Sequence, residues 1–170
     1  MTALFRHFWA FGALLALFLL SGGGCARRPQ PPSSSPPAAP PAPVTLVPAA
    51  ELKKAVPRLP APFQPVLFLE RPGTVTYHVR KGGSLAATLS VRDLSGKDSV
   101  RRGLFQGAGQ EVQGYPAVPT SMGGGLAVLV GDRFQVEVVS LSPSVGQKRR
   151  DAWLDAFDYA RLAALARAAR

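Results

Sequence analysis

The sequence has few of the residues that most often carry chemistry. It contains a single cysteine, Cys25, and two histidines, of which His78 alone lies outside the apolar N-terminal region. Metal sites need clusters of Cys, His or carboxylate side chains, so no metal site is expected, and one cysteine cannot form a disulfide within the chain. A serine nucleophile needs a base. His78 shares the polar face of a predicted strand with Thr76 and Arg80, where an ordinary surface role is expected.

Acidic residues are scarce as well, with 10 Asp and Glu against 20 Lys and Arg and a formal net charge of +10. The best-placed carboxylate pair, Asp132 and Glu137, is explained by a turn and by the polar face of a strand, so no glycosidase-type pair is expected. The glycine-rich segments 107–109 and 123–125 are not followed by helices and lack the context of a phosphate-binding loop. We therefore predict no enzyme activity, no catalytic residue and no cofactor, with a cryptic hydrolase as the least favoured alternative.

No apolar run is long enough to cross a bilayer comfortably. The longest apolar run, Phe8–Leu20, has thirteen residues and no charge, against the about 20 of a membrane-spanning helix. It follows Arg6 and is followed by Ser21 and three glycines, directly before Cys25. A positive start, a short apolar middle and a small-residue end are typical of a secretory signal peptide, and we predict one at residues 1–24.

With Cys25 at its end, this arrangement resembles the lipobox of bacterial lipoproteins, in which the cysteine is diacylated and becomes the first residue after cleavage. The family usually has Leu, Val or Ile three positions before the cysteine, where this chain has Gly22. Ordinary secretory cleavage after Ala26 is the alternative. In the family, an Asp directly after the cysteine favours retention at the inner membrane. Ala26 therefore implies a lipid anchor in the outer membrane, facing the periplasm of the bacterial cell envelope.

Proline, alanine and serine dominate the chain behind Cys25. A segment of this composition cannot bury a core, so residues 25–50 are predicted to form an extended linker. From Gln30 to Pro48 it would reach on the order of 50 Å, at about 3.1 Å per residue. The remaining length, residues 51–170, suits one folded domain.

Period-two alternation of apolar residues predicts β-strands in this domain. The segments that favour strands are 66–70, 74–80, 84–92, 112–119, 126–130 and 133–141. The prolines in the fourth of these segments favour a sheet edge. The last two segments are expected to form a hairpin at Gly131-Asp132, a two-residue turn that places Leu129 opposite Phe134.

The C-terminal residues predict a helix that covers the sheet. Residues 144–147 have the spacing of a capping box, and Asp158 is expected to cap a second helical segment after a break. The apolar stripe of this helix consists of Trp153, Leu154, Phe157, Leu162 and Leu165. We predict an α+β fold, in which an antiparallel sheet of about five strands is covered on one face by the C-terminal helix.

These features together predict a non-enzymatic envelope lipoprotein, a tethered module that contacts the membrane through Cys25 and binds or positions a protein or polymer partner. The basic composition leaves one alternative, a module that binds a polyanion such as lipopolysaccharide, a wall polymer or DNA. Nucleic acid is the least favoured of these ligands, because aromatic residues do not interleave with the basic ones.

Overall fold

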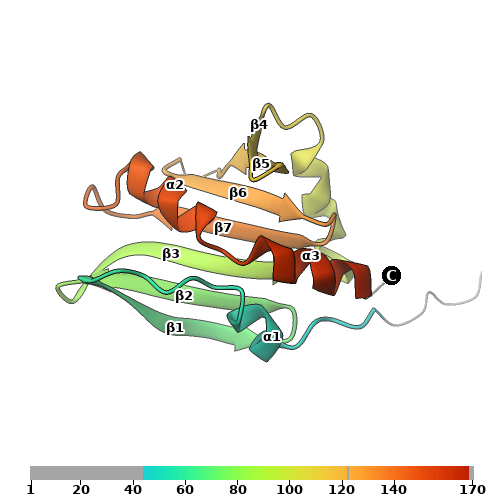
Figure 1. The fold of residues 1–170 in the computed structure, drawn as a ribbon, viewed down its shortest axis with the longest axis horizontal. Helices are drawn as coiled ribbons and strands as arrows, with labels where there is room; N and C mark the ends of the chain where they lie inside the picture. The colour runs from blue at the N-terminus through green and yellow to red at the C-terminus, as the bar shows by residue number, and fades with distance from the viewer. Residues whose placement is uncertain (1–43, 122, 169–170) are drawn as a thin grey trace, which may run out of the picture. The chain divides into compact units, whose positions relative to one another are not determined.

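Seven antiparallel strands form one continuous sheet in this computed structural model, which describes residues 44–121 and 123–168 (Figure 1). Their order across the sheet is β1-β2-β3-β7-β6-β5-β4, so two meanders meet where β3 pairs with β7. The strands are β1 (Phe63–Arg71), β2 (Thr74–Lys81), β3 (Ser84–Asp93), β4 (Gln110–Val112), β5 (Tyr115–Pro119), β6 (Gly125–Val130) and β7 (Phe134–Ser140).

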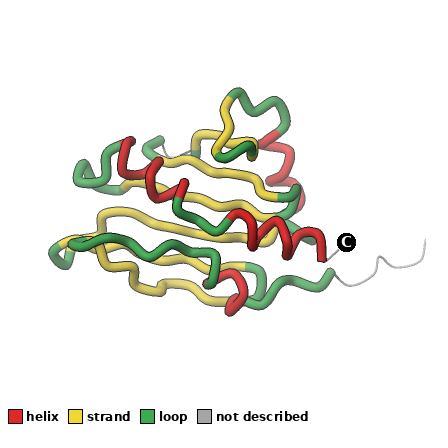
Figure 2. The backbone as a smooth tube through the Cα atoms, viewed as in Figure 1, coloured by secondary structure: helices red, strands yellow, loops and turns green. Residues whose placement is uncertain are grey.

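Helices pack on both faces of the sheet. Three of them, α1 (Ala49–Lys53), α2 (Gln147–Asp155) and α3 (Tyr159–Ala168), share one apolar core with the strands. A short non-helical break separates α2 from α3 (Figure 2). The 3-10 helix η1 (Gly96–Phe105) covers part of the opposite face, where its Phe105 joins a second, smaller core.

The larger core lies between the sheet and the α-helices. Alternate residues of β3 and β7, such as Leu89 and Val136, point into it and are fully buried, as the alternation of these segments predicts. From the helices, Leu154 and Leu162 fill the same core and are also fully buried. The predicted α+β fold with an antiparallel sheet and C-terminal helical cover is therefore present.

The sheet has seven strands rather than the predicted number of about five. The C-terminal cover is divided into two helices by a break, as expected from Asp158. Part of the difference in strand number lies in segment 112–119, which was expected to be a single edge strand. Gln113 and Gly114 have φ values of 51° and 79° and form a two-residue turn between β4 and β5. Such a turn with two left-handed residues is typical of tight hairpins, but Gln in its first position gives no signal in the sequence.

The hairpin of β6 and β7 exists, but its predicted register is wrong by one residue. The loop contains Gly131, Asp132 and Arg133, so that Val130 rather than Leu129 pairs with Phe134. Leu129 consequently faces η1 and belongs to the smaller core. The sequence could not distinguish the two registers, because every residue of β6 is buried and both of its faces are apolar.

The helix ends also differ in part from expectation. The predicted capping box at residues 144–147 is wrong, because α2 begins after Gly146 and no side chain caps it. Asp158 does cap the second segment: its Oδ1 accepts a hydrogen bond of 2.8 Å from the backbone N–H of Arg161. This capping bond explains why a new helix begins directly after the break.

Candidate functional site

The predicted lipidation site, Cys25, lies outside the described residues, as do the signal peptide and most of the linker. Within residues 44–121 and 123–168, no helix is long and apolar enough to cross a membrane. The same part of the chain contains no group of three or more His, Cys, Asp or Glu side chains that could hold a metal ion.

His78 lies on β2, where its ring stacks on that of Phe68 with 3.9 Å between the ring centroids. Phe68 belongs to the neighbouring edge strand β1 and is itself 63% exposed. Among the described residues, no carboxylate forms a hydrogen bond with the imidazole that could orient it as a general base. The structure therefore does not bring His78 together with Asp132 or Glu137, the acids considered from the sequence.

Among the side chains that the structure describes, the most completely buried charged group is the carboxylate of Asp93, at the end of β3. Its side chain is 0% exposed and forms an ion pair of 2.7 Å with Arg133. Further hydrogen bonds reach it from Ser95 and from the backbone N–H of Val47. Arg133 also donates to the backbone carbonyl of Thr45. This pair therefore attaches residues 45–47, which fall near the end of the predicted linker, to the ends of the central strands β3 and β7.

Burial alone would raise the pKa of Asp93, because it removes the charged form from water. The hydrogen bonds from Arg133, Ser95 and the backbone N–H of Val47 outweigh that effect and hold the pKa below its ordinary value. The carboxylate is therefore charged and fully paired at neutral pH, which indicates a structural role in holding the chain rather than proton transfer.

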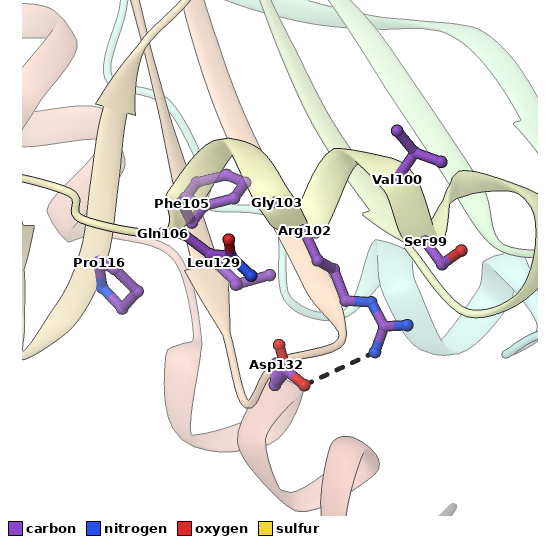
Figure 3. Close-up of a pocket in the computed structure, with 9 residues that line it drawn as sticks. All are labelled: Ser99, Val100, Arg102, Gly103, Phe105, Gln106, Pro116, Leu129 and Asp132. Atoms are coloured by element: carbon purple, nitrogen blue, oxygen red, sulfur yellow. Dashed lines mark ion pairs between the residues drawn. The ribbon is translucent and has the colours of Figure 1, made fainter. Parts of the chain in front are cut away.

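A first hollow, of about 530 Å³, lies between η1 and the hairpin of β6 and β7 (Figure 3). Arg102 of η1 points toward Asp132 in the loop after β6, and the two charged groups lie 3.6 Å apart. Leu129 forms part of the apolar side of this hollow. Val100 points away from the ion pair in Figure 3 and is 84% exposed. The η1 surface thus combines an exposed ion pair with large apolar side chains in solvent.

A second hollow, which we call the α2 groove, has a volume of about 700 Å³ and lies beside the first turns of α2. Its apolar part includes Trp153 and the rings of Pro60 and Pro143. Its charged part consists of Arg58, Lys148 and Arg149.

The sequence predicted Trp153 in the apolar stripe of the C-terminal helix, but no local pattern placed it beside Lys148, Arg149 and Arg58. Arg58 could not be assigned to the same place, because it stands about ninety residues earlier in the chain. The groove forms because the chain between α1 and β1 returns beside α2.

Comparison with protein families, with curated proteins and with solved structures gave no match.

Proposed function

We propose that this protein is a lipid-anchored, non-enzymatic module of the bacterial cell envelope, which carries a small α+β domain on a tether and binds or positions a partner. The observation that carries the proposal is the single cysteine, Cys25, directly behind a short apolar run and before the proline-rich segment. Lipidation accounts for a lone thiol in an exported protein, which has no disulfide partner within its own chain.

The attachment of the domain to its linker supports this proposal. Asp93 and Arg133 hold Thr45 and Val47 where β3 and β7, the two strands at the middle of the sheet, lie side by side. A force on the linker would therefore act on the central strands β3 and β7, which have a strand partner on each side, and not on a fraying chain end. Such an attachment suits a domain that is held at a distance from a membrane.

The η1 surface is the best candidate for contact with a protein partner. Val100 and Leu104 of η1 are 84% and 64% exposed, and Arg102 of the same helix pairs with Asp132. Exposed apolar side chains rimmed by charged groups are a common feature of protein interaction sites. We expect the double change Val100→Asp and Leu104→Asp to abolish cross-linking to the partner, whereas Leu141→Asp, at a 46% exposed residue of another loop, should leave it unchanged.

The anchor is tested by Cys25→Ser in the full chain. We expect this variant to lose labelling by a radioactive or clickable palmitate and to leave the membrane fraction, because the acylated thiol is absent. Gly22→Leu, which installs the residue usual in the lipoprotein family, serves as the matched control and should retain both properties. If Cys25→Ser were labelled by palmitate to the same extent as the wild type, the proposal would be contradicted.

The polyanion-binding alternative draws on the net charge of +10 and on the basic side of the α2 groove. Electrostatic binding to a polymer of phosphates weakens steeply as salt increases. Retention of Cys25→Ser on membranes at low salt, with release at high salt, would favour this alternative over the lipid anchor.

A further inference from the structure

The α2 groove has an apolar side and a cationic side. A ligand that uses both must carry an apolar group and a negative charge. The floor of the groove is the indole of Trp153, which is only 4% exposed and packs edge-on against Phe63 at 4.9 Å between ring centroids. Pro60 and Pro143 extend this apolar floor. Proline offers no backbone N–H, so this side of the groove favours an apolar ligand group.

The other side of the groove is cationic. Arg58 and Lys148 are exposed, and neither forms an ion pair with an acid in the described part of the chain. Arg149 lies with its guanidinium 4.8 Å from the centre of the Phe63 ring and donates a hydrogen bond to the carbonyl of Ser144. No Asp or Glu lines the groove. Its charge is therefore complementary to an anion.

The positions of these cations are unfavourable for the helix itself. The first turn of α2 contains no acidic residue, and Lys148, Arg149 and Arg150 stand there instead. Positive side chains at a helix N-terminus oppose the helix dipole, which favours negative charge at that end. Residues that destabilise the local structure in this way are expected mainly at functional sites.

We propose that the α2 groove binds a single acidic lipid molecule, whose phosphate contacts Arg58, Lys148 and Arg149 and whose acyl chain lies along Trp153 and the proline rings. The volume of about 700 Å³ falls in the range of about 300–1,000 Å³ that is typical of small-ligand pockets. An acidic peptide would match the cations but would not need the apolar side that Trp153 and the proline rings form. The inference goes beyond the proposed function by giving the domain a lipid ligand of its own, in addition to the anchor.

The test uses the full chain with Trp9→Phe in vesicles of phosphatidylcholine, so that Trp153 is the only tryptophan whether or not residues 1–24 have been cleaved. Soluble dihexanoyl phosphatidic acid is titrated, with dihexanoyl phosphatidylcholine as a probe of equal chain length and inorganic phosphate as a probe without chains. We expect a saturable change in Trp153 emission with the phosphatidic acid alone. Because the probes are soluble, their binding does not depend on whether Cys25 is acylated, and failure of the anchor is distinguishable from failure of the groove.

The charge requirement is tested with Arg58→Glu combined with Lys148→Glu. We expect the dissociation constant for dihexanoyl phosphatidic acid to rise about tenfold or more, because two charge-assisted contacts are reversed. Arg71→Glu, at the opposite end of β1 from Phe63, is the matched control and should bind as wild type does. Unchanged denaturant midpoints show that each variant is folded. A variant that unfolds is replaced by Lys148→Gln, for which a smaller loss in the same direction is expected.

Three results would overturn the proposal. Equal binding of the two dihexanoyl lipids would show that the headgroup charge is not recognised. Binding of inorganic phosphate as tight as that of the lipid would show that the apolar floor contributes nothing. An acidic peptide that displaces dihexanoyl phosphatidic acid at equal concentration would assign the groove to an acidic protein segment instead.

Discussion

Removal of the Asp93 carboxylate should be among the most damaging single changes in the domain. The carboxylate accepts five hydrogen bonds, from Arg133, Ser95 and Val47, and its side chain is 0% exposed. Asp93→Ala leaves the guanidinium of Arg133, which is 12% exposed, without its counter-charge. It also leaves the backbone N–H groups of Val47 and Ser95 without acceptors.

Breaking a buried ion pair from one side costs about 3–5 kcal/mol, because an uncompensated charge remains in a poorly solvated place. This is a large share of the about 5–15 kcal/mol that stabilises a domain of this kind. Urea unfolding of the purified protein measures this loss of stability. If the free energy of unfolding falls by about 2 kcal/mol per M urea, the midpoint of Asp93→Ala should be about 2 M lower than that of wild type. Asp132→Asn is the control, because that acid is 68% exposed and 3.6 Å from Arg102, and Asn tolerates the left-handed backbone of this position, φ +55°. It should change stability by less than about 0.5 kcal/mol.

The same carboxylate predicts a dependence of stability on pH. The pKa of Asp93 is lowered in the folded protein from its ordinary value of 3.8, so the unfolded chain takes up the proton first as the pH falls. The stabilisation is therefore complete above about pH 4 and is lost as the pH falls through the lowered pKa. Asp93→Asn should lack this part of the acid response. Equal loss of stability below pH 4 in wild type and in Asp93→Asn, or an Asp93→Ala cost below about 1 kcal/mol, would refute the reasoning.

Three further predictions concern the remainder of the fold. Phe157→Ala should cost about 3–5 kcal/mol in urea unfolding, because this ring is 4% exposed, whereas Asp155→Ala, at an exposed position of α2, should cost less than about 0.5 kcal/mol. Gly131→Ala should lower the thermal midpoint, since its φ is +60° and the new Cβ would lie 2.7 Å from that of Ala166. Limited proteolysis should leave a core that begins at or before Val44, and N-terminal sequencing of a core that begins well inside α1 would contradict the Asp93 attachment.

Local patterns predicted much of this fold because each depends on residues close in the chain. The strands β2 and β3 follow from the alternation in segments 74–80 and 84–92, and the structure pairs them as a hairpin around Gly82 and Gly83. The burial of Phe134, Val136 and Val138 follows in the same way. The restart of the helix at α3 was predictable because Asp158 caps it within one turn.

Registers and turns were less predictable, because they depend on what lies on the second face of a strand. All six residues of β6 are buried, so their pattern did not show which of them face η1. The third residue of the β6–β7 loop, Arg133, was assigned to the following strand. Its side chain instead turns back to Asp93, forty residues earlier. Arg133 stays in the loop, and Val130 pairs with Phe134.

The candidate sites lay beyond sequence reasoning for the same physical reason. The predicted strand 84–92 ends directly before Asp93, and no local pattern indicates that Val47 and Arg133 will surround this residue. The cations of the α2 groove come from two segments, around Arg58 and Lys148, that the fold brings together. Cys25 is the opposite case, since its predicted role depends only on its neighbours in the chain. The anchor could therefore be proposed from sequence, whereas the lipid contact proposed for the domain required the structure.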